Sequence, residues 1–508
     1  MSKVSKTLFK GSAFQTLSFF AQVIVVFFLM PFIVKTLGDR LYGLWTLVGA
    51  VIGYYGLLDF GMSLTVNRHI AAAIGADDKE ESNYIFNSAF FLFSGIGIIA
   101  LLVTVLLTIL TPYLFENPSD ASLFAKVILV VGVYLAIEFP VRVYQGALAA
   151  KMRYDIIANI QMLTLALRTA LTVLILVLGL KVLALAWVTV TSGIPGMILF
   201  VYYSKKNMPH LKLQWSQYSA DRTKKIFTYS FFAFISNLAE MLRHNIDVVV
   251  ISVFLGLATV THYKIASTMV QYFRKLVVTV LGVYFPLFGQ LHGAQDSEGL
   301  KASFFFSSKL ATCIAGFIGF GFVAWGHPFI ERWMGPEYLD AFPVLFILTV
   351  ASTLSIAQSS SPAVLFVTSN HRLYSMYGLA DGALNLILSL LLVKPFGMVG
   401  VAMGTLIPLM GVKLVIQPLH VCKVMSIRYS EYAGRMLKTV LRVAVALIIP
   451  TLISVTYVAP NYRNLFVISL LSAGAYVVVI WYIELNRDEK LVFIRTVTPR
   501  LMLRKAVD

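Results

Sequence analysis

Long apolar blocks dominate this sequence and decide what it can fold into. About fourteen stretches of roughly 20 to 30 mostly apolar residues follow one another, and each can cross a ~30 Å hydrocarbon layer as a helix. Only 13% of the 508 residues are charged, about half the share of a soluble protein. No block alternates as the strands of a membrane barrel do. The sequence therefore predicts an all-α polytopic membrane protein and excludes soluble enzymes, collagens and disulfide scaffolds.

The apolar blocks define the expected spans to within a few residues. The fourteen spans are 11–34, 42–73, 84–111, 123–149, 155–179, 182–203, 226–255, 260–290, 300–326, 341–366, 373–393, 398–421, 437–457 and 462–484. The first block is too long for the core of a signal peptide, and no small-residue cleavage site follows it. We therefore expect it to be a retained first span.

Lysine and arginine are unevenly divided between the two sides that an even number of spans creates. The termini and the loops on their side carry 24 of them, concentrated in 204–225 and in the tail after residue 484. The opposite side carries six: Lys35, Arg40, Lys181, Arg332, Lys394 and Arg463. By the positive-inside rule this bias places both termini in the cytoplasm. Basic loops beside an anionic leaflet explain much of the net charge of +17 without a nucleic-acid partner.

The loops leave little room for an enzyme. None is long enough to form a domain, and the longest, 204–225, has no glycine-rich phosphate loop. The chain has no HExxH or DxD-like cluster, and Cys313 and Cys422 lie too far apart in sequence to argue a CxxC metal site. We therefore expect no catalytic residues, no metal site and no cofactor.

An internal repeat becomes visible when the sequence is shifted against itself by 218 positions. Leu37-Gly38 then falls on Leu255-Gly256, and the loop signature GAxDxE at residues 75–80 falls on the same signature at residues 293–298. A polar signature at a fixed distance from Leu-Gly is a strong match in so apolar a chain. Because the shift covers six spans, an even number, the two halves have the same orientation and form a parallel repeat.

The repeat predicts two pseudo-symmetric six-helix lobes around a central cavity, an arrangement that suits alternating access. The expected domains are the N-lobe 1–203 with spans 1–6, a cytoplasmic linker 204–222, the C-lobe 223–422 with spans 7–12, two extra helices in 423–484 and a basic cytoplasmic tail 485–508. A channel would need no such duplication, although duplication does not exclude one.

Charged residues within the spans are the candidates for function, since each costs at least ~2.5 kcal/mol at mid-bilayer unless a partner, water or a cavity receives it. Leaving out residues at the first two or the last position of a span, eleven are basic and five acidic, and this cationic excess predicts a wet cavity that receives anions. The cations nearest the middle of their spans are Arg168, Arg243, Arg274 and Lys275. Lys264 and Lys275 are eleven residues apart, three helical turns, so they share a face of span 8.

Two further groups extend the candidate site. Arg142 follows a proline in span 4, where a kink frees backbone groups and lets the side chain turn inward, with Glu138 as a nearby partner. On span 7, Glu240 and Asp247 lie one helical turn on either side of Arg243. These acids could carry a coupling ion, or they could neutralise the arginine inside a packed bundle, and the sequence leaves both alternatives open.

The stretch LGDRLYGLWTLVGAVIGYYGLLDFGMSLTVNRHIA, residues 37–71, resembles the polysaccharide transporter family, the Wzx-type O-antigen flippases. LG-x-x-x-YG, LLDFG and NR-x-IA carry the resemblance, which is clearest over about residues 5 to 95. The family is part of the MOP exporter superfamily, which also includes multidrug and toxin extrusion transporters and lipid II flippases. The resemblance implies a two-lobe transporter with a cationic cavity. Its implied cargo is an undecaprenyl-pyrophosphate-linked oligosaccharide, moved from the cytoplasmic to the periplasmic leaflet of the inner membrane.

The chemistry of such a cargo is compatible with a basic interior. Arginine forks offer a pyrophosphate bidentate, charge-assisted hydrogen bonds, and the lipid tail can stay in the bilayer if a gap between helices opens sideways. Membrane lipids, and a polymerase or other glycan-assembly proteins, are the partners implied. The competing interpretations are an ion-coupled multidrug antiporter, for which we expect an acidic cavity, and a lipid II flippase.

Overall fold

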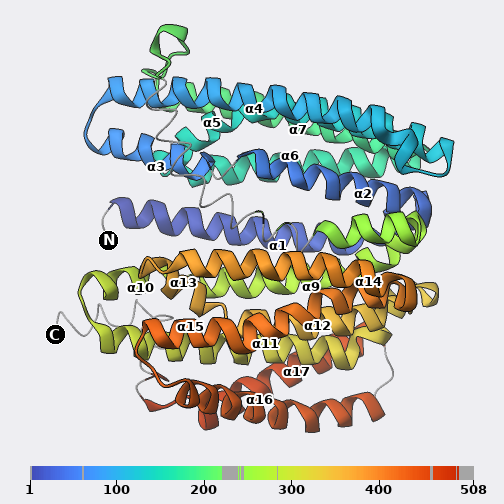
Figure 1. The fold of residues 1–508 in the computed structure, drawn as a ribbon, viewed down its shortest axis with the longest axis vertical. Coiled ribbons are helices and arrows are strands. Elements are labelled where there is room, and N and C mark those ends of the chain that lie inside the picture. Colours follow the sequence, from blue (N-terminus) through green and yellow to red (C-terminus); the bar gives the residue numbers. More distant parts are fainter. Residues whose placement is uncertain are drawn as a thin grey trace. The chain divides into compact units, whose positions relative to one another are not determined.

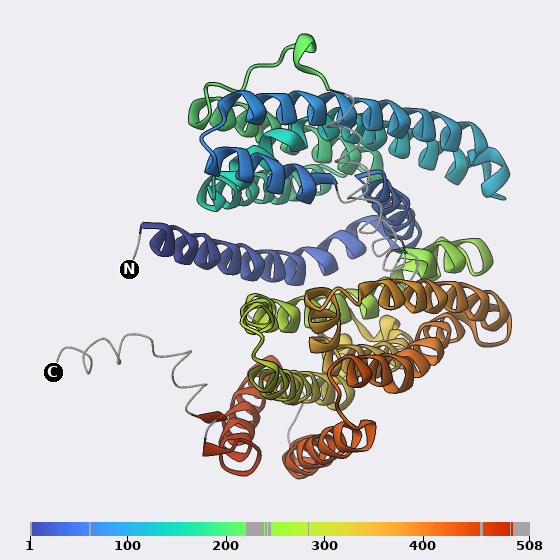
Figure 2. The same ribbon diagram turned by 60° about the vertical axis from the view of Figure 1, so that its left-hand side comes forward.

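The computed structural model describes residues 3–59, 62–219, 245–282, 284–457 and 461–490 without residue 488, together with residues 238 and 241. Every regular element in these ranges is a helix (Figures 1 and 2). Among the described residues, eleven helices are long and apolar enough to span a membrane. The predicted all-α polytopic membrane fold is confirmed, whereas the number of fourteen spans stays a prediction.

The chain forms two compact units, Met1–Lys264 and Ile265–Asp508. The boundary falls inside α9, a helix that runs from Leu257 to Leu281. The domain limits expected from the sequence, at residues 203, 222, 422 and 484, stay predictions.

The first unit is built from long helices joined by short turns. They are α1 (Lys3–Leu37), α2 (Asp39–Tyr55), the 3-10 turn η1 (Gly56–Asp59), α3 (Met62–Gly75), α4 (Lys79–Leu114), α5 (Pro118–Ala150), α6 (Tyr154–Val177), α7 (Val182–Asn207), the 3-10 turn η2 (Trp215–Gln217) and the helix Asn245–Phe254. Helix α5 packs against α3, α4 and α7 (Figure 1). Two glycines let these helices approach, because a Cβ at Gly97 would overlap the Ala136 carbonyl and one at Gly132 would overlap Thr104.

The second unit is also built from helices joined by short turns. Its elements after α9 are α10 (Tyr284–Gly293), α11 (Ser297–Trp333), η3 (Pro336–Tyr338), α12 (Ala341–Ala357), α13 (Ser360–Val367), α14 (His371–Gly411), the π-helix η4 (Val412–Ile416), α15 (Gln417–Val424), α16 (Tyr429–Tyr457), α17 (Tyr462–Val479) and the π-helix η5 (Ile480–Glu484).

The chain repeats the same local structures at a spacing of 218 residues. Asp78 and Asp296 are both N-caps whose carboxylates accept a hydrogen bond of 2.8 Å from the backbone amide three residues later. The residue before each cap is left-handed, with φ of 53° at Asp77 and 56° at Gln295. The same spacing relates two pairs of glycines with positive φ: Gly38 and Gly256, and Gly179 and Gly397. The repeat found in the sequence is therefore present in the local backbone structure.

Helix α14 is a hairpin of two antiparallel helices. Its backbone leaves the helical region only at Gly397, where φ is 59° and ψ is −142°, in the turn between predicted spans 373–393 and 398–421. The two arms touch closely, since a Cβ at Gly404 would lie 2.7 Å from the Ser389 backbone nitrogen. Asn385 Nδ2 also donates a 2.8 Å hydrogen bond to Thr405 Oγ1 across the hairpin.

The predicted span 42–73 is interrupted, as is 341–366 between α12 and α13. The block 42–73 was expected to be a single span, but α2 ends at Tyr55, a 3-10 turn covers Gly56–Asp59, and α3 begins at Met62. Three glycines, Gly53, Gly56 and Gly61, fall in or beside this region, and glycine weakens a helix interior by about 1 kcal/mol relative to alanine. Hydropathy reports how apolar a stretch is, and it does not detect such a break.

Candidate functional site

Arg142 lies in the middle of an interaction network on α5. Its Nη2 atom is 3.5 Å from Glu138 Oε1, one helical turn earlier, and its guanidinium lies 4.6 Å from the centre of the Phe139 ring. The two charged side chains are 28% and 29% exposed, so neither is completely enclosed by the helix bundle. Glu138 is thus the partner of Arg142, as the sequence suggested.

Arg168 on α6 belongs to the same network. Its Nε atom donates a 3.4 Å hydrogen bond to Ser192 Oγ on α7, and the arginine side chain is otherwise exposed. Tyr134 on α5 interacts electrostatically with Glu138, Arg142 and Arg168. Two cations predicted from separate spans therefore converge around one tyrosine. We call Arg142, Arg168, Glu138 and Tyr134 the α5/α6 cation cluster.

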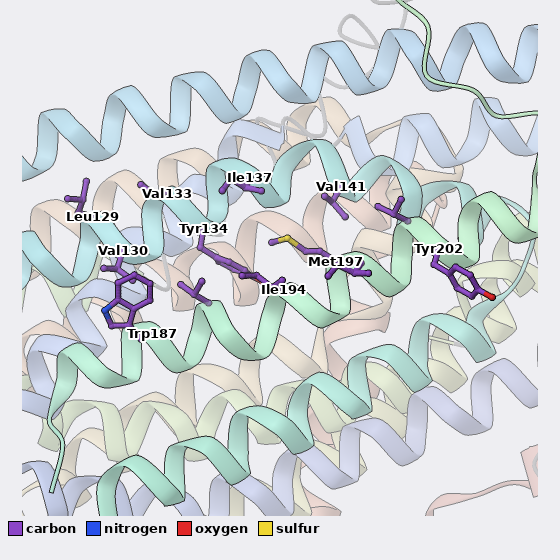
Figure 3. Close-up of a pocket in the computed structure, with 13 residues that line it drawn as sticks. Leu129, Val130, Val133, Tyr134, Ile137, Val141, Trp187, Ile194, Met197 and Tyr202 are labelled. Atoms are coloured by element: carbon purple, nitrogen blue, oxygen red, sulfur yellow. The ribbon is translucent and has the colours of Figure 1, made fainter. Parts of the chain in front are cut away.

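Tyr134 also lies on the wall of an apolar groove between α5 and α7 (Figure 3). The groove has a volume of about 790 Å³, and its walls are formed by aliphatic and aromatic side chains of both helices. A Cβ at Gly193 of α7 would lie 2.6 Å from Tyr134 Cζ and closer still to the hydroxyl oxygen. Glycine at this position therefore allows the tyrosine ring to stand between the two helices.

The other described basic candidates lie on α9. Arg274 is half-buried, Lys275 is exposed, and both belong to the second unit. Lys264 is the last residue of the first unit. Each of the three takes part in further polar or ring interactions. Their grouping with Arg142 and Arg168 around one cavity stays a prediction.

Asp247 is the one ion-coupling candidate within the described residues. Its side chain is only 4% exposed, and Oδ2 accepts a 2.5 Å hydrogen bond from the Tyr263 hydroxyl. The helix Asn245–Phe254, which carries Asp247, approaches α2 closely, since a Cβ at Gly53 would lie 2.6 Å from Asn245 Nδ2. Glu240 and Arg243, the neighbours expected for Asp247, lie outside the described residues.

Lys413 is a buried cation that the sequence analysis did not select. It lies on the π-helix η4, is 5% exposed, and donates a 2.7 Å hydrogen bond from Nζ to Gln417 Oε1. Gln417 in turn donates to the backbone carbonyl of Gln358, whose side chain accepts a 2.8 Å hydrogen bond from the Tyr432 hydroxyl. A lysine within a span and a glutamine four residues later, on the same helix face, was the available signal.

Among the described residues there is no group of three or more His, Cys, Asp or Glu side chains placed to hold a metal ion. The groups available for binding are the arginine side chains of the α5/α6 cation cluster and the apolar groove beside them. Guanidinium groups can bind an anion, and the neighbouring groove can bind an apolar chain.

Comparison with known proteins identifies the family. A model of the polysaccharide biosynthesis protein family matches residues 40–343, more than half of the chain. The chain belongs to this family. Among its relatives, the uncharacterized membrane protein EpsK of Bacillus subtilis (strain 168) is 23% identical over 421 residues, which cover 80% of this chain and 81% of that protein. The probable low-salt glycan biosynthesis flippase Agl15 of Haloferax volcanii is 20% identical over 442 residues, covering 86% of this chain and 89% of the relative.

Solved structures share the fold. The lipid II flippase MurJ in an inward closed conformation superposes with a TM-score of 0.69 at 14% identity, over 95% of this chain and 99% of that one. An inward-facing multidrug resistance MATE family transporter of the MOP superfamily gives a TM-score of 0.65 at 18% identity, over 79% of this chain and 98% of that one. The resemblance to the polysaccharide transporter family is therefore confirmed by the family model, and the solved structures show the shared fold.

Proposed function

We propose that this protein is a flippase that moves lipid-linked oligosaccharides across a membrane by alternating access. Its substrate is an undecaprenyl-pyrophosphate-linked oligosaccharide, such as an O-antigen unit. Transport runs from the cytoplasmic to the periplasmic leaflet of the inner membrane, and both termini lie in the cytoplasm. Glycan-assembly proteins such as a polymerase are its expected functional partners.

The observation that carries this proposal is the convergence of Arg142 and Arg168 around Tyr134, in a chain of the polysaccharide biosynthesis family. One arginine is paired with Glu138 and the other donates to a neutral serine hydroxyl, so these three charges sum to a net positive cluster. A positive cluster within membrane helices is suited to an anion that must cross. A carrier of organic cations would be expected to present the opposite sign.

The role proposed for the α5/α6 cation cluster is to bind the pyrophosphate of the headgroup. A pyrophosphate cannot enter hydrocarbon unaccompanied, since each charge must leave water. The exposed Arg168 can offer a bidentate fork to phosphate oxygens, while the Glu138 contact holds Arg142 in place. The binding set proposed for the full cavity is Arg142, Arg168, Arg243, Lys264, Arg274 and Lys275.

The driving force can come from two sources. Outward movement of an anion from a negative cytoplasm is downhill by ~2.3 kcal/mol per charge per 100 mV. Asp247 and Glu240 are the proposed groups for a coupling ion, because a carboxylate in a buried hydrogen bond, as at Asp247, can respond to ion binding.

Surface-glycan export in cells tests the proposal. Arg274→Ala and Lys275→Ala combined should abolish export while the amount of protein in the membrane is unchanged, and Arg142→Ala and Arg168→Ala combined should do the same. Lys301→Ala is the control, because Lys301 forms an ion pair with the exposed Glu298 at a helix start, outside the proposed binding set. Normal export in a double mutant would remove its two residues from the binding set.

Two other substrates are compatible with this fold. One is an organic cation, which would be exchanged for an ion, and the other is lipid II. Purified protein in liposomes distinguishes them. The proposal expects movement of a labelled lipid-linked oligosaccharide, no uptake of cationic dyes, and no transport of lipid II at a comparable rate.

A further inference from the structure

We infer that the groove between α5 and α7 binds the polyprenyl chain of the lipid-linked substrate while the anionic headgroup rests on the α5/α6 cation cluster. The inference rests on the proposed function and adds to it a lateral binding site for the tail. We call the surface formed by Val133, Ile137, Trp187, Ile194, Ile198 and their neighbours the α5/α7 groove.

The α5/α7 groove is apolar throughout and open to its surroundings. Of its thirteen lining residues, nine are aliphatic (Figure 3). The other four are Met197, Trp187 and the two tyrosines, Tyr134 and Tyr202. Ile137 is 59% exposed, Trp187 53% and Ile198 61%. Within a bilayer such a surface must face something apolar, because water would leave these side chains unfavourably hydrated.

The groove runs along the helices. Its α5 wall extends from Leu129 to Val141 and its α7 wall from Trp187 to Tyr202, or about 18 Å and 22 Å at 1.5 Å per helical residue. These lengths are about two-thirds of a ~30 Å hydrocarbon layer. An extended chain can therefore lie in the groove parallel to α5 and α7.

Tyr134 joins the groove to the cations. Its ring forms part of the groove wall, and it interacts electrostatically with Arg142, Arg168 and Glu138. A ligand that follows the groove past Tyr134 thus meets a net positive cluster. This arrangement complements an amphiphile whose anionic group is directly attached to its hydrocarbon chain, as a polyprenyl pyrophosphate is.

The depth of this junction favours a transported lipid over a resident phospholipid. Tyr134 lies sixteen residues from each end of α5, and Arg168 lies nine residues, about 14 Å, from the nearer end of α6. The headgroup of a resting phospholipid stays at the membrane surface, whereas a lipid in transit must place its headgroup near the middle. The α5/α6 cation cluster therefore lies at the depth of the headgroup of a lipid in transit, and not at the depth of a phospholipid headgroup.

Binding to the full-length protein in phospholipid nanodiscs tests the inference, with undecaprenyl pyrophosphate as the long-chain probe and geranyl pyrophosphate as the short-chain probe. Ile198→Trp fills the groove, and Ile109→Trp on α4 makes the same change at a similarly exposed residue, 63% against 61%, outside the groove. We expect Ile198→Trp to weaken long-chain binding about tenfold, the cost of losing contacts to roughly two methylene groups. Short-chain binding, and long-chain binding to Ile109→Trp, should match the unsubstituted protein.

Each other outcome has a defined meaning. Equal long-chain binding by Ile198→Trp and Ile109→Trp overturns the tail site but leaves the proposed function intact. Loss of short-chain binding by Ile198→Trp also overturns it, because the groove would then act through the headgroup site. No binding of undecaprenyl pyrophosphate to the unsubstituted protein overturns the inference and the proposed function together.

A second measurement uses the unsubstituted protein, so its result does not depend on whether a variant folds. Undecaprenyl pyrophosphate carrying a photoreactive diazirine in its chain should label peptides of α5 and α7. Labelling by a diazirine phospholipid at the same sites and to the same extent would contradict the inference. Labelling confined to the smaller apolar pocket beside Phe317, Trp325 and Leu447 in the second unit would also contradict it.

Discussion

The ring of Tyr134 stands directly over Gly193, so close that even a methyl group at position 193 would overlap the tyrosine hydroxyl. This contact lies between α5 and α7, and Tyr134 belongs both to the α5/α6 cation cluster and to the wall of the α5/α7 groove. The groove and the cluster therefore share one structural support.

Gly193→Ala should push Tyr134 toward the groove, because the ring is the only part of the contact that can give. Overpacking of this kind costs about 1–3 kcal/mol, so we expect a lower melting temperature in detergent. Gly146→Ala, on the α5 helix that carries Tyr134, is the control, since no atom lies within 4 Å of a Cβ there. Equal melting temperatures for the two variants would show that the ring moves aside without cost.

Gly400→Ala should destabilise the protein more than Gly193→Ala does. A Cβ at Gly400 would lie 2.6 Å from the backbone carbonyl carbon of Leu392, and backbone cannot rotate away as a side chain can. We expect a loss of about 3 kcal/mol, the upper end for overpacking, measured by thermal unfolding. Gly411→Ala, at the end of the same α14 segment with no neighbour within 4 Å, should keep the melting temperature within about 2 °C.

Arg142→Lys should impair glycan export nearly as strongly as Arg142→Ala. Lysine keeps the charge but lacks the planar fork that binds two oxygens at once, and it cannot reproduce the stacking on Phe139. Export per unit of membrane protein should fall at least tenfold in both variants. Full export by Arg142→Lys would mean that only the charge of this residue matters.

His210 should make the segment 208–219 sensitive to pH. Burial, together with the charges of Lys151 and Lys79, lowers the pKa of His210 below its ordinary value of 6.5. The folded segment therefore favours neutral histidine, so its stability is full above pH ~6.5 and falls as the pH drops toward the lowered pKa. Hydrogen exchange in residues 208–219, corrected for the intrinsic rate, should speed up on acidification, and His210→Gln should remove this effect. The same acid-induced rise in His210→Gln would assign it to another group.

The fold was predictable wherever local sequence determines local structure. The signature around Asp78 recurs at Asp296 because each aspartate caps a helix after a left-handed residue, and both cap and turn are encoded within six residues. The turn at Gly397 lies between the predicted spans 373–393 and 398–421, where the sequence analysis expected a turn. The break after Tyr55 was not predictable, since hydropathy averages over a glycine-rich stretch.

The candidate site was predictable residue by residue but not as an arrangement. Depth in its span selected Arg168 and a proline kink selected Arg142, but no sequence periodicity relates α5 to α6, so their proximity to Tyr134 is visible only in the folded structure. Tyr134 itself is an ordinary aromatic residue in an apolar span. Lys413 was not predicted because, beyond its neighbour Gln417, its hydrogen-bond network continues to Gln358 and Tyr432, which lie far apart in sequence.

Reconstituted transport tests the central claim most directly. Purified protein in liposomes should move a fluorescent undecaprenyl-pyrophosphate-linked oligosaccharide between leaflets. The double variant Arg142→Ala and Arg168→Ala should reduce the rate to that of protein-free vesicles, while Lys301→Ala should leave it unchanged. Transport by the double variant at the rate of the unsubstituted protein would contradict the account.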